Sequence, residues 1–256
     1  MRAMARAGLV VERALSAAAA AIVEGATTRD IDEAAARVIR GSGATSNFLG
    51  YHGYPASTCV SINDEVVHGI PGARALTAGD VVSIDCGAII DGWHGDSALT
   101  VTVGSVTPGD AALIEGTREA LWAGVAAFAS ARSVADISAA IEDAAVAAGL
   151  EPIEGYVGHG IGRAMHEAPE VPNYRTRGSS PSVGVGSCLA LEPMLVRGAP
   201  ETRVLDDGWT VVTEDGSRAA HWEHSIARHE TGIWVLTAAD GGASELASFG
   251  IVPVAP

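Results

Sequence analysis

Residues 81–103 read VVSIDCGAIIDGWHGDSALTVTV, two β-forming runs separated by Asp91-Gly92. An Asp-Gly pair between such runs predicts a β-hairpin with a two-residue turn. With those two residues as the loop, Gly87 lies opposite Asp96, and Asp85 lies two positions earlier on the same strand face. Because strand side chains alternate, Asp85 and Asp96 become diagonal neighbours on one face, with Cα atoms roughly 7–8 Å apart.

The two aspartates of this hairpin indicate a cation site. Ionised carboxylates aimed into the same space repel each other and raise each other's pKa, and a cation between them removes that cost. Carboxylates bridge paired metal ions that lie about 3.5–4 Å apart. Gly87 and Ala98 are small, so we expect open space beside Asp85 and Asp96. The hairpin alone also fits an antiparallel sheet whose aspartates face solvent, and this alternative stays open at this point.

Helical segments occur in pairs before and after this region. Apolar spacing and end signals predict helices over residues 2–24, 27–41, 107–130 and 133–149. Strands and turns fill residues 45–104 and the chain after 149. The order helix, helix, strands therefore occurs twice. It predicts a mixed α/β (α+β) fold, with residues 1–256 as a single domain and related halves of about 1–104 and 105–256 that share one sheet.

Short sequence patterns recur in the two halves. The capping pattern Thr27-x-x-Asp30-Ile31 matches Ser133-x-x-Asp136-Ile137, and His68-Gly69-Ile70 matches His159-Gly160-Ile161. Either match alone could arise by chance. Together with the repeated element order, they favour two related α/β halves.

The overall composition restricts the class of ligand. The chain has 256 residues and a net charge of −15, which gives no electrostatic footprint for nucleic acid or an anionic membrane. An acidic protein instead suits cations or a ligand with a free amino group. No apolar run reaches transmembrane length, and amphipathic spacing favours a core helix over a signal peptide at residues 2–24. The three scattered cysteines are expected to be reduced thiols of a cytoplasmic protein.

Further candidate ligands lie in the second half. His159 is part of the glycine-rich stretch GYVGHGIG, where backbone can approach a ligand closely. Glu192 lies within the apolar stretch CLALEP, where a charge is costly unless it is paired or metal-bound. Glu223 lies between β-forming residues in AAHWEHSI. Each residue alone is more often a satisfied structural polar group. The chain lacks an H-E-x-x-H motif, a G-x-S-x-G elbow and a phosphate-binding P-loop.

Considered together, the motifs resemble a known family. The chain is similar to type I methionine aminopeptidases, M24-type metallopeptidases, in SINDEVVHGIP (61–71), SIDCGAIIDGWHGDSALT (83–100), GYVGHGIGRAMHEAP (155–169), LALEPM (189–194) and HWEHSI (221–226). The resemblance covers nearly the whole chain in the right order. It implies the pita-bread fold, in which two pseudo-symmetric αα-β halves share a curved antiparallel sheet with helices on its outer face.

The resemblance also implies a dinuclear metal centre held by Asp85, Asp96, His159, Glu192 and Glu223. In this assignment Asp85 chelates one divalent ion, and His159 with Glu192 holds the other. Asp96 and Glu223 bridge both ions. The donors suit Co, Mn, Fe or Zn, and affinity order alone does not choose among these metals.

The implied activity is removal of the N-terminal methionine from nascent proteins and peptides with a small second residue. Metal-activated hydroxide would attack the first peptide bond. His166 would donate to the developing oxyanion, His68 would contact the scissile amide nitrogen, and Glu192 would move a proton to the leaving amine. Without the resemblance, both histidines would be read as structural.

Specificity for methionine requires a slim apolar pocket. By resemblance, the pocket residues are Tyr51, Tyr54, Cys59, Met165 and Trp209. Met165 departs from the phenylalanine often found there, so the width of the pocket is left open. Aromatic and sulfur-containing side chains suit a thioether, although Cys59 and Met165 also fit plain core packing.

The expected partners are the N-termini of nascent polypeptides, with transient proximity to the ribosome, no specificity for nucleic acid and no membrane. We expect a cytoplasmic monomer. One alternative is an Xaa-Pro aminopeptidase, although those relatives usually carry an extra N-terminal domain for which this chain has no length. The other is a catalytically inactive pita-bread binding protein, which should have lost ligands that this chain retains.

Overall fold

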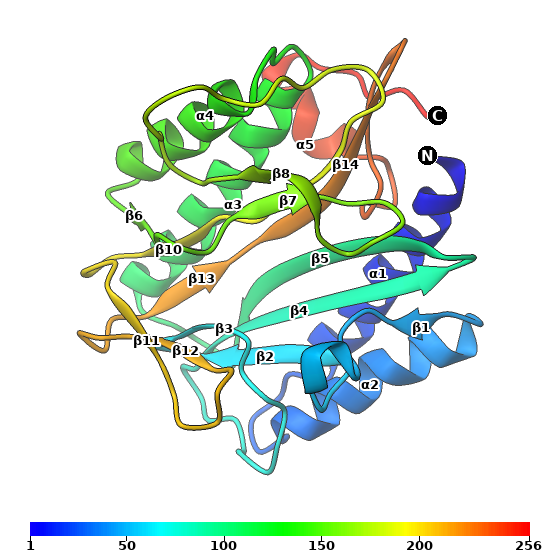
Figure 1. Ribbon diagram of the computed structural model, residues 1–256. Helices are drawn as coiled ribbons and strands as arrows, with labels where there is room; N and C mark the ends of the chain where they lie inside the picture. The colour runs from blue at the N-terminus through cyan, green and yellow to red at the C-terminus, as the bar shows by residue number, and fades with distance from the viewer.

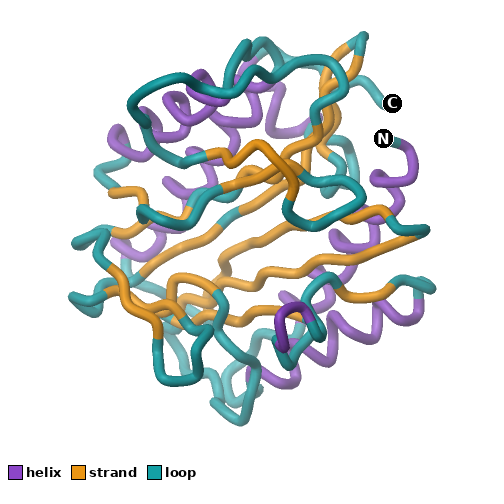
Figure 2. Tube along the Cα trace, viewed as in Figure 1, coloured by secondary structure: helices purple, strands orange, loops and turns teal.

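Two pairs of long helices lie behind one curved sheet in the computed structural model, which describes residues 1–256 (Figure 1). The first pair is α1 (Arg2–Ala20) and α2 (Thr28–Gly41), and the second is α3 (Pro108–Phe128) and α4 (Val134–Ala147). Figure 2 shows the long central strands in front of these helices. Short helical segments follow near the C-terminus, α5 (Ala243–Leu246) and η2 (Ala247–Phe249).

Nine strands form the main sheet. Its central order is β1-β4-β5-β14-β9-β7-β8, with β2 paired to β4 and β15 paired to β14. The bounds are β1 Thr45–Ser46, β2 Thr58–Ile62, β4 Val81–Ile90, β5 Trp93–Thr102, β7 Gly158–Gly160, β8 Glu167–Val171, β9 Cys188–Leu191, β14 Glu223–His229 and β15 Gly232–Val235. Two three-stranded sheets have the orders β13-β10-β6 and β11-β12-β3. Their strands are β3 Glu65–Val67, β6 Glu151–Pro152, β10 Met194–Val196, β11 Thr202–Val204, β12 Val211–Thr213 and β13 Ala219–His221.

The helix starts follow the predicted capping signals. Thr27 with Asp30, and Ser133 with Asp136, form reciprocal capping boxes, and Pro108 opens α3. The end of α1 differs from the prediction, because the helix stops at Ala20 rather than near residue 24. Backbone bonds from residues 21 and 22 reach back three residues, and the N–H of residue 25 donates to residue 76, so the chain has already turned away.

The hairpin of β4 and β5 has the predicted register. Asp85 pairs with Ala98 and Gly87 pairs with Asp96. Both loop residues have positive φ, 52° at Asp91 and 72° at the following glycine, as a type I′ turn requires. Asp85 and Asp96 therefore share the sheet face predicted from the sequence.

Each half buries its own apolar cluster. One cluster draws its members from residues 10–103 and the other from residues 113–246. The halves meet where β5 pairs with β14, with Ala98 opposite Glu223 and Ser97 opposite His224. Hydroxyl groups join the same two strands, since Ser225 Oγ donates to Asp96 O at 2.7 Å and accepts from its N–H at 3.0 Å. None of the helices combines the length and apolar character needed to cross a membrane.

Candidate active site

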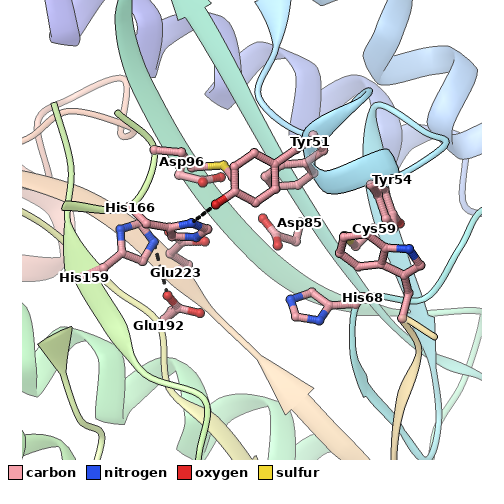
Figure 3. A pocket seen from close by; sticks show the side chains of 13 residues that line it. Tyr51, Tyr54, Cys59, His68, Asp85, Asp96, His159, His166, Glu192 and Glu223 are labelled. Carbon is pink, nitrogen blue, oxygen red and sulfur yellow. Dashed lines mark hydrogen bonds and ion pairs between the residues drawn. The ribbon is translucent and has the colours of Figure 1, made fainter. Parts of the chain in front are cut away.

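A cavity of about 160 Å³ lies in front of β4 and β5 in Figure 3, on the sheet side away from the helices. It gathers every site residue nominated from the sequence, and Phe48 in addition. The lining residues are Phe48, Tyr51, Tyr54, Cys59, His68, Asp85, Asp96, His159, Met165, His166, Glu192, Trp209 and Glu223. One end of the cavity is acidic, and the other is apolar and aromatic.

Strands of both halves supply the acidic end. Asp85 and Asp96 come from β4 and β5, whereas His159 comes from β7 and Glu223 begins β14. Glu192 follows the last residue of β9 directly. The β5–β14 pairing brings Glu223 beside the hairpin, and β9 pairs with both β7 and β14. The five predicted metal ligands therefore converge only when the two halves are assembled.

Three of these ligands form a tight group. Ligand atoms of Asp96, His159 and Glu223 all lie within 4.8 Å of one another. Nδ1 of His159 lies 2.9 Å from the carbonyl of Gly160. Donation to that carbonyl puts the proton on Nδ1 and leaves the Nε2 lone pair for a metal. Nε2 of His159 is 3.4 Å from Oε1 of Glu192, and Asp85 lies outside the tight group on the same cavity.

Burial and crowding disfavour ionisation of the carboxylates in the absence of a cation. Burial raises the pKa of Asp85, Glu192 and Glu223 well above the usual values, and neighbouring carboxylates, Asp96 among them, raise each pKa further. Burial raises the pKa of Asp96 to about 7, although the Asn47 side chain and a backbone N–H oppose the shift. No lysine or arginine lines the cavity.

The donor set fits divalent cations. Oδ1 of Asp85, Oδ1 of Asp96 and Oε1 of Glu223 are buried without a hydrogen-bond partner. Unpaired buried carboxylate oxygens are costly, and cations supply the missing partner. Carboxylates combined with one imidazole are suitable ligands for Mn, Fe, Co or Zn. The residues present at this site therefore match the metal centre implied by the sequence.

The space beside Gly87 differs from the expectation. The Asn47 side chain fills it, and a Cβ at position 87 would lie 2.2 Å from Asn47 Nδ2. The same nitrogen donates to the carbonyl of Gly95 at 3.1 Å. Open space does lie beside Asp85 and Asp96, which both line the cavity, but not at Gly87, where a residue remote from the hairpin in sequence packs against the strand.

Two histidines stand near the acidic end. His166 Nδ1 lies 2.8 Å from the Tyr51 hydroxyl, and its ring lies 4.4 Å from the His159 ring between centroids. His68 has a left-handed φ of 61° and packs edge-on against Trp209. Burial lowers the pKa of His68 to about 4 and also lowers that of His166. Both imidazoles are therefore neutral near pH 7.

The apolar end is a packed wall of aromatic and sulfur-containing side chains. Phe48, Tyr54, Cys59 and Met165 are buried and pack together, with Trp209 alongside. The Tyr54 hydroxyl donates to backbone carbonyls at 3.0 and 3.1 Å, which fixes its ring. Burial raises the pKa of the Cys59 thiol, which stays protonated. This wall suits an apolar group of a ligand.

Two buried polar residues that contact Glu192 or lie beside it were not nominated from the sequence. His221 is 2 % exposed, and its Nε2 lies 3.9 Å from Oε2 of Glu192. Asn173 is fully buried and donates from Nδ2 to the carbonyl of Glu192 at 3.1 Å. For His221 the sequence held one signal. It precedes Glu223 by two positions, and residues two apart in an extended chain point to the same side. The contact of Asn173 had no such signal, because it joins residues far apart in the chain.

Comparison with known proteins identifies the class. The pattern of Metallopeptidase family M24 matches residues 2–230. The chain belongs to this family, whose members are metal-dependent hydrolases. Over 242 residues it is 54% identical to methionine aminopeptidase 1 of Mycobacterium tuberculosis, an alignment that covers 92% of this chain and 91% of that protein. It is 43% identical to methionine aminopeptidase 1 of Bacillus subtilis, over 84% of this chain and 87% of that protein.

Solved structures confirm the pita-bread fold. Methionine aminopeptidase from Thermotoga maritima matches with a TM-score of 0.89 and 39% identity, over 92% of this chain and 95% of that chain. Prolidase from Pyrococcus furiosus matches with a TM-score of 0.75 and 20% identity, over 93% of this chain and 63% of that chain. The second likeness shows the fold alone.

Proposed function

We propose that this chain removes the N-terminal methionine from peptides and nascent proteins with a small second residue. The observation that carries the proposal is the tight group of Asp96, His159 and Glu223, within 4.8 Å of one another, in a cavity whose far end is apolar. Identity of 54% to a methionine aminopeptidase over 92% of this chain supports the substrate class. In this proposal residues 1–256 act as one catalytic domain, a cytoplasmic monomer near the ribosome, with halves of about 1–104 and 105–256.

The proposed cofactor is a pair of divalent ions, Co, Mn, Fe or Zn. Asp85 would hold one ion, His159 and Glu192 the other, and Asp96 with Glu223 would bridge both. When bound, the pair acidifies a water molecule and polarises the peptide carbonyl. The unpaired oxygens of Asp85, Asp96 and Glu223 support this assignment.

Glu192 is proposed to carry the proton. Its Oε1 faces His159, while its backbone carbonyl is held by Asn173 Nδ2. The carboxylate would take the proton of the attacking water and deliver it to the leaving amine. A single carboxylate can do both because the water and the amine nitrogen are bound at the same carbon in the tetrahedral species.

His166 is proposed to stabilise the developing oxyanion. The Tyr51 hydroxyl lies 2.8 Å from Nδ1 of His166. Donation from Tyr51 would place the imidazole proton on Nε2, where it can donate to the carbonyl oxygen as charge develops. His68, across the cavity, would contact the scissile amide nitrogen. Neutral imidazoles suit these roles, since His166 can donate to the carbonyl oxygen and His68 can accept from the amide N–H.

Substrate selection is proposed to combine charge and shape. The four carboxylates favour the free α-amino group, which restricts cleavage to the N-terminus. Tyr54, Cys59, Met165 and Trp209, with Tyr51 at the rim, would enclose the methionine side chain, whose thioether packs well against sulfur and aromatic groups. Partners would be the exposed N-termini of nascent polypeptides.

The test is methionine release from Met-Ala-Ser by metal-stripped protein after addition of Mn²⁺, Fe²⁺, Co²⁺ or Zn²⁺. Met-Lys-Ser and Ala-Pro-Ala are the controls. We expect metal-dependent release from Met-Ala-Ser alone. Cleavage of Ala-Pro-Ala instead would assign the chain to Xaa-Pro aminopeptidases. A folded, metal-loaded protein without any activity would indicate a binding protein.

A further inference from the structure

His221 is held rigidly at the edge of the acidic end. It is the last residue of β13 and only 2 % of it is exposed. Its N–H donates to Thr100 Oγ1 at 2.9 Å, and the same hydroxyl donates to the carbonyl of His221 at 2.7 Å. Thr100 Oγ1 also lies 2.8 Å from Ser83 Oγ. This network fixes the backbone of His221 against β4 and β5, so its side chain has little freedom to move away.

The imidazole of His221 faces Glu192. Its Nε2 is buried, has no hydrogen-bond partner, and lies 3.9 Å from Oε2 of Glu192. The other oxygen of Glu192, Oε1, lies 3.4 Å from Nε2 of His159. The carboxylate therefore stands between two imidazoles, one for each oxygen. Asn173 fixes the backbone of the same glutamate at 3.1 Å.

The polar groups around His221 leave Glu192 as its partner. An unsatisfied buried nitrogen is costly, so it is expected to pair wherever a nearby acceptor can reach it. Nε2 of His221 has no other hydrogen-bond partner, and Oε2 of Glu192 is the carboxylate oxygen that faces it. Such contacts commonly tighten when a site is filled, so we expect the 3.9 Å separation to shorten to a hydrogen bond in the occupied site.

We propose that His221 is a positioning residue whose Nε2–H donates to Oε2 of Glu192 and holds that carboxylate with Oε1 turned toward His159. The inference rests on the proposed function, in which Glu192 is both a metal ligand and the proton carrier. The hydrogen bond would fix which oxygen serves the metal centre.

A matched pair of substitutions separates this role from simple core filling. Glutamine and methionine have similar length and flexibility, but only glutamine carries a donor near the position of Nε2. We expect His221→Gln to resemble the unsubstituted protein. His221→Met should keep the fold and lose divalent-metal affinity by on the order of 10- to 100-fold, as is usual when a group orienting a ligand is removed. Its kcat should fall while KM for Met-Ala-Ser changes little.

The measurements are Mn²⁺ titration by calorimetry and steady-state kinetics at saturating Mn²⁺. His224→Met is the control, because this histidine lies only three residues further along the chain, in β14, but its Nδ1 contacts the hydroxyl groups of Ser97 and Thr237 instead of Glu192. It should lower Tm without an equal loss of metal affinity. If His221→Met does not fold, His221→Asn, whose amide stops short of Glu192, takes its place with the same expected results.

Two results would overturn the inference. The first is a folded His221→Met protein that binds Mn²⁺ and turns over like the unsubstituted one. The second is a His221→Gln protein as impaired as His221→Met, since the donor would then be irrelevant. Failure of the proposed function is seen separately, as an unsubstituted protein that binds Mn²⁺ but releases no methionine. In that event the calorimetric comparison still tests the contact between His221 and Glu192.

Discussion

Asp85 and Glu223 lie on either side of Ala98 in one row across three strands. Asp85 pairs with Ala98 between β4 and β5, and Ala98 pairs with Glu223 between β5 and β14. Residues paired in this way project to the same sheet face, and neighbouring strands are about 4.8 Å apart, so the two acids have Cα atoms roughly 10 Å apart. The methyl group of Ala98 is small enough for both carboxylates to turn toward the space above it.

Enlarging Ala98 should therefore weaken the metal centre. Ala98→Val keeps a good strand former but adds two methyl groups between Asp85 and Glu223. We expect a folded protein whose Mn²⁺ affinity falls by on the order of 10-fold. Losses of this size are usual when a group that orients a metal ligand is changed. Ala98→Ser is the small control and should bind Mn²⁺ normally. Calorimetry measures the Mn²⁺ affinity of both variants. Equal affinities would show that the larger valine side chain fits between Asp85 and Glu223 without displacing either carboxylate.

Asp96→Asn should remove activity and metal pairing together, because a bridging ligand is lost. The same change should raise the Tm of the metal-free protein at pH 8, since it removes one of several buried like charges. Asp110→Asn is the contrasting variant. Asp110 does not line the cavity, and its Oδ2 forms an ion pair with Arg218 Nη1 at a distance of 2.8 Å. It should lower Tm and leave metal binding intact. Metal analysis and calorimetry check both variants, and full turnover by Asp96→Asn would remove the two-ion assignment.

Metal removal should make stability fall as pH rises from 6.5 to 8.5. The folded protein has raised pKa values at Asp85, Glu192 and Glu223, and about 7 at Asp96, against unfolded values of about 4. The folded state therefore holds more protons than the unfolded state, and deprotonation through this window destabilises it. Buried histidines with lowered pKa values act in the opposite sense, but only below their unfolded pKa of about 6.5.

The check is Tm with EDTA against Tm with Mn²⁺ across this pH range. Mn²⁺ should compensate the carboxylate charges, so the gain in Tm from the metal should be larger at pH 8.5 than at pH 6.5. A Tm of the metal-free protein that is flat or rising over the same range would contradict the raised pKa values.

His166→Ala should fold and bind Mn²⁺ normally, with kcat lower by roughly 10²–10³, the range for one oxyanion donor. Tyr51→Phe should give a smaller loss, because it removes only the hydroxyl that orients His166. Steady-state kinetics with Met-Ala-Ser and Mn²⁺ calorimetry distinguish these effects. A large loss of metal in His166→Ala would mean that this residue supports the metal centre instead.

Local signals in the sequence were sufficient for the hairpin and the helix starts. Asp91-Gly92 sets the β4–β5 register, because a two-residue loop and a side-chain period of two leave one alignment. The capping pair of Thr27 and Asp30 locates the start of α2, because both partners lie within one turn of the chain and are visible in the sequence. The end of α1 was less predictable, because its alanine-rich run lacks a strong stop signal before Gly25.

Other features of the site depend on contacts that spacing does not encode. The sequence nominated the ligands by family resemblance, but the pairing of β14 with β5 and β9 is what brings Glu223 and Glu192 together. Asn47 fills the space beside Gly87 from a separate loop. His221 carried a faint signal through its two-residue step from Glu223, whereas its approach to Glu192 exists only in three dimensions.

The boundary between β5 and β14 divides the predicted ligands into two groups. Asp85 and Asp96 lie on one side of it, and His159, Glu192 and Glu223 lie on the other. An ion shared by both groups would act as a reversible cross-link between the halves. We therefore expect amide hydrogen exchange along β5 and β14 to quicken when metal is withdrawn, and the lifetime of the protein against proteases to follow the supply of metal around it.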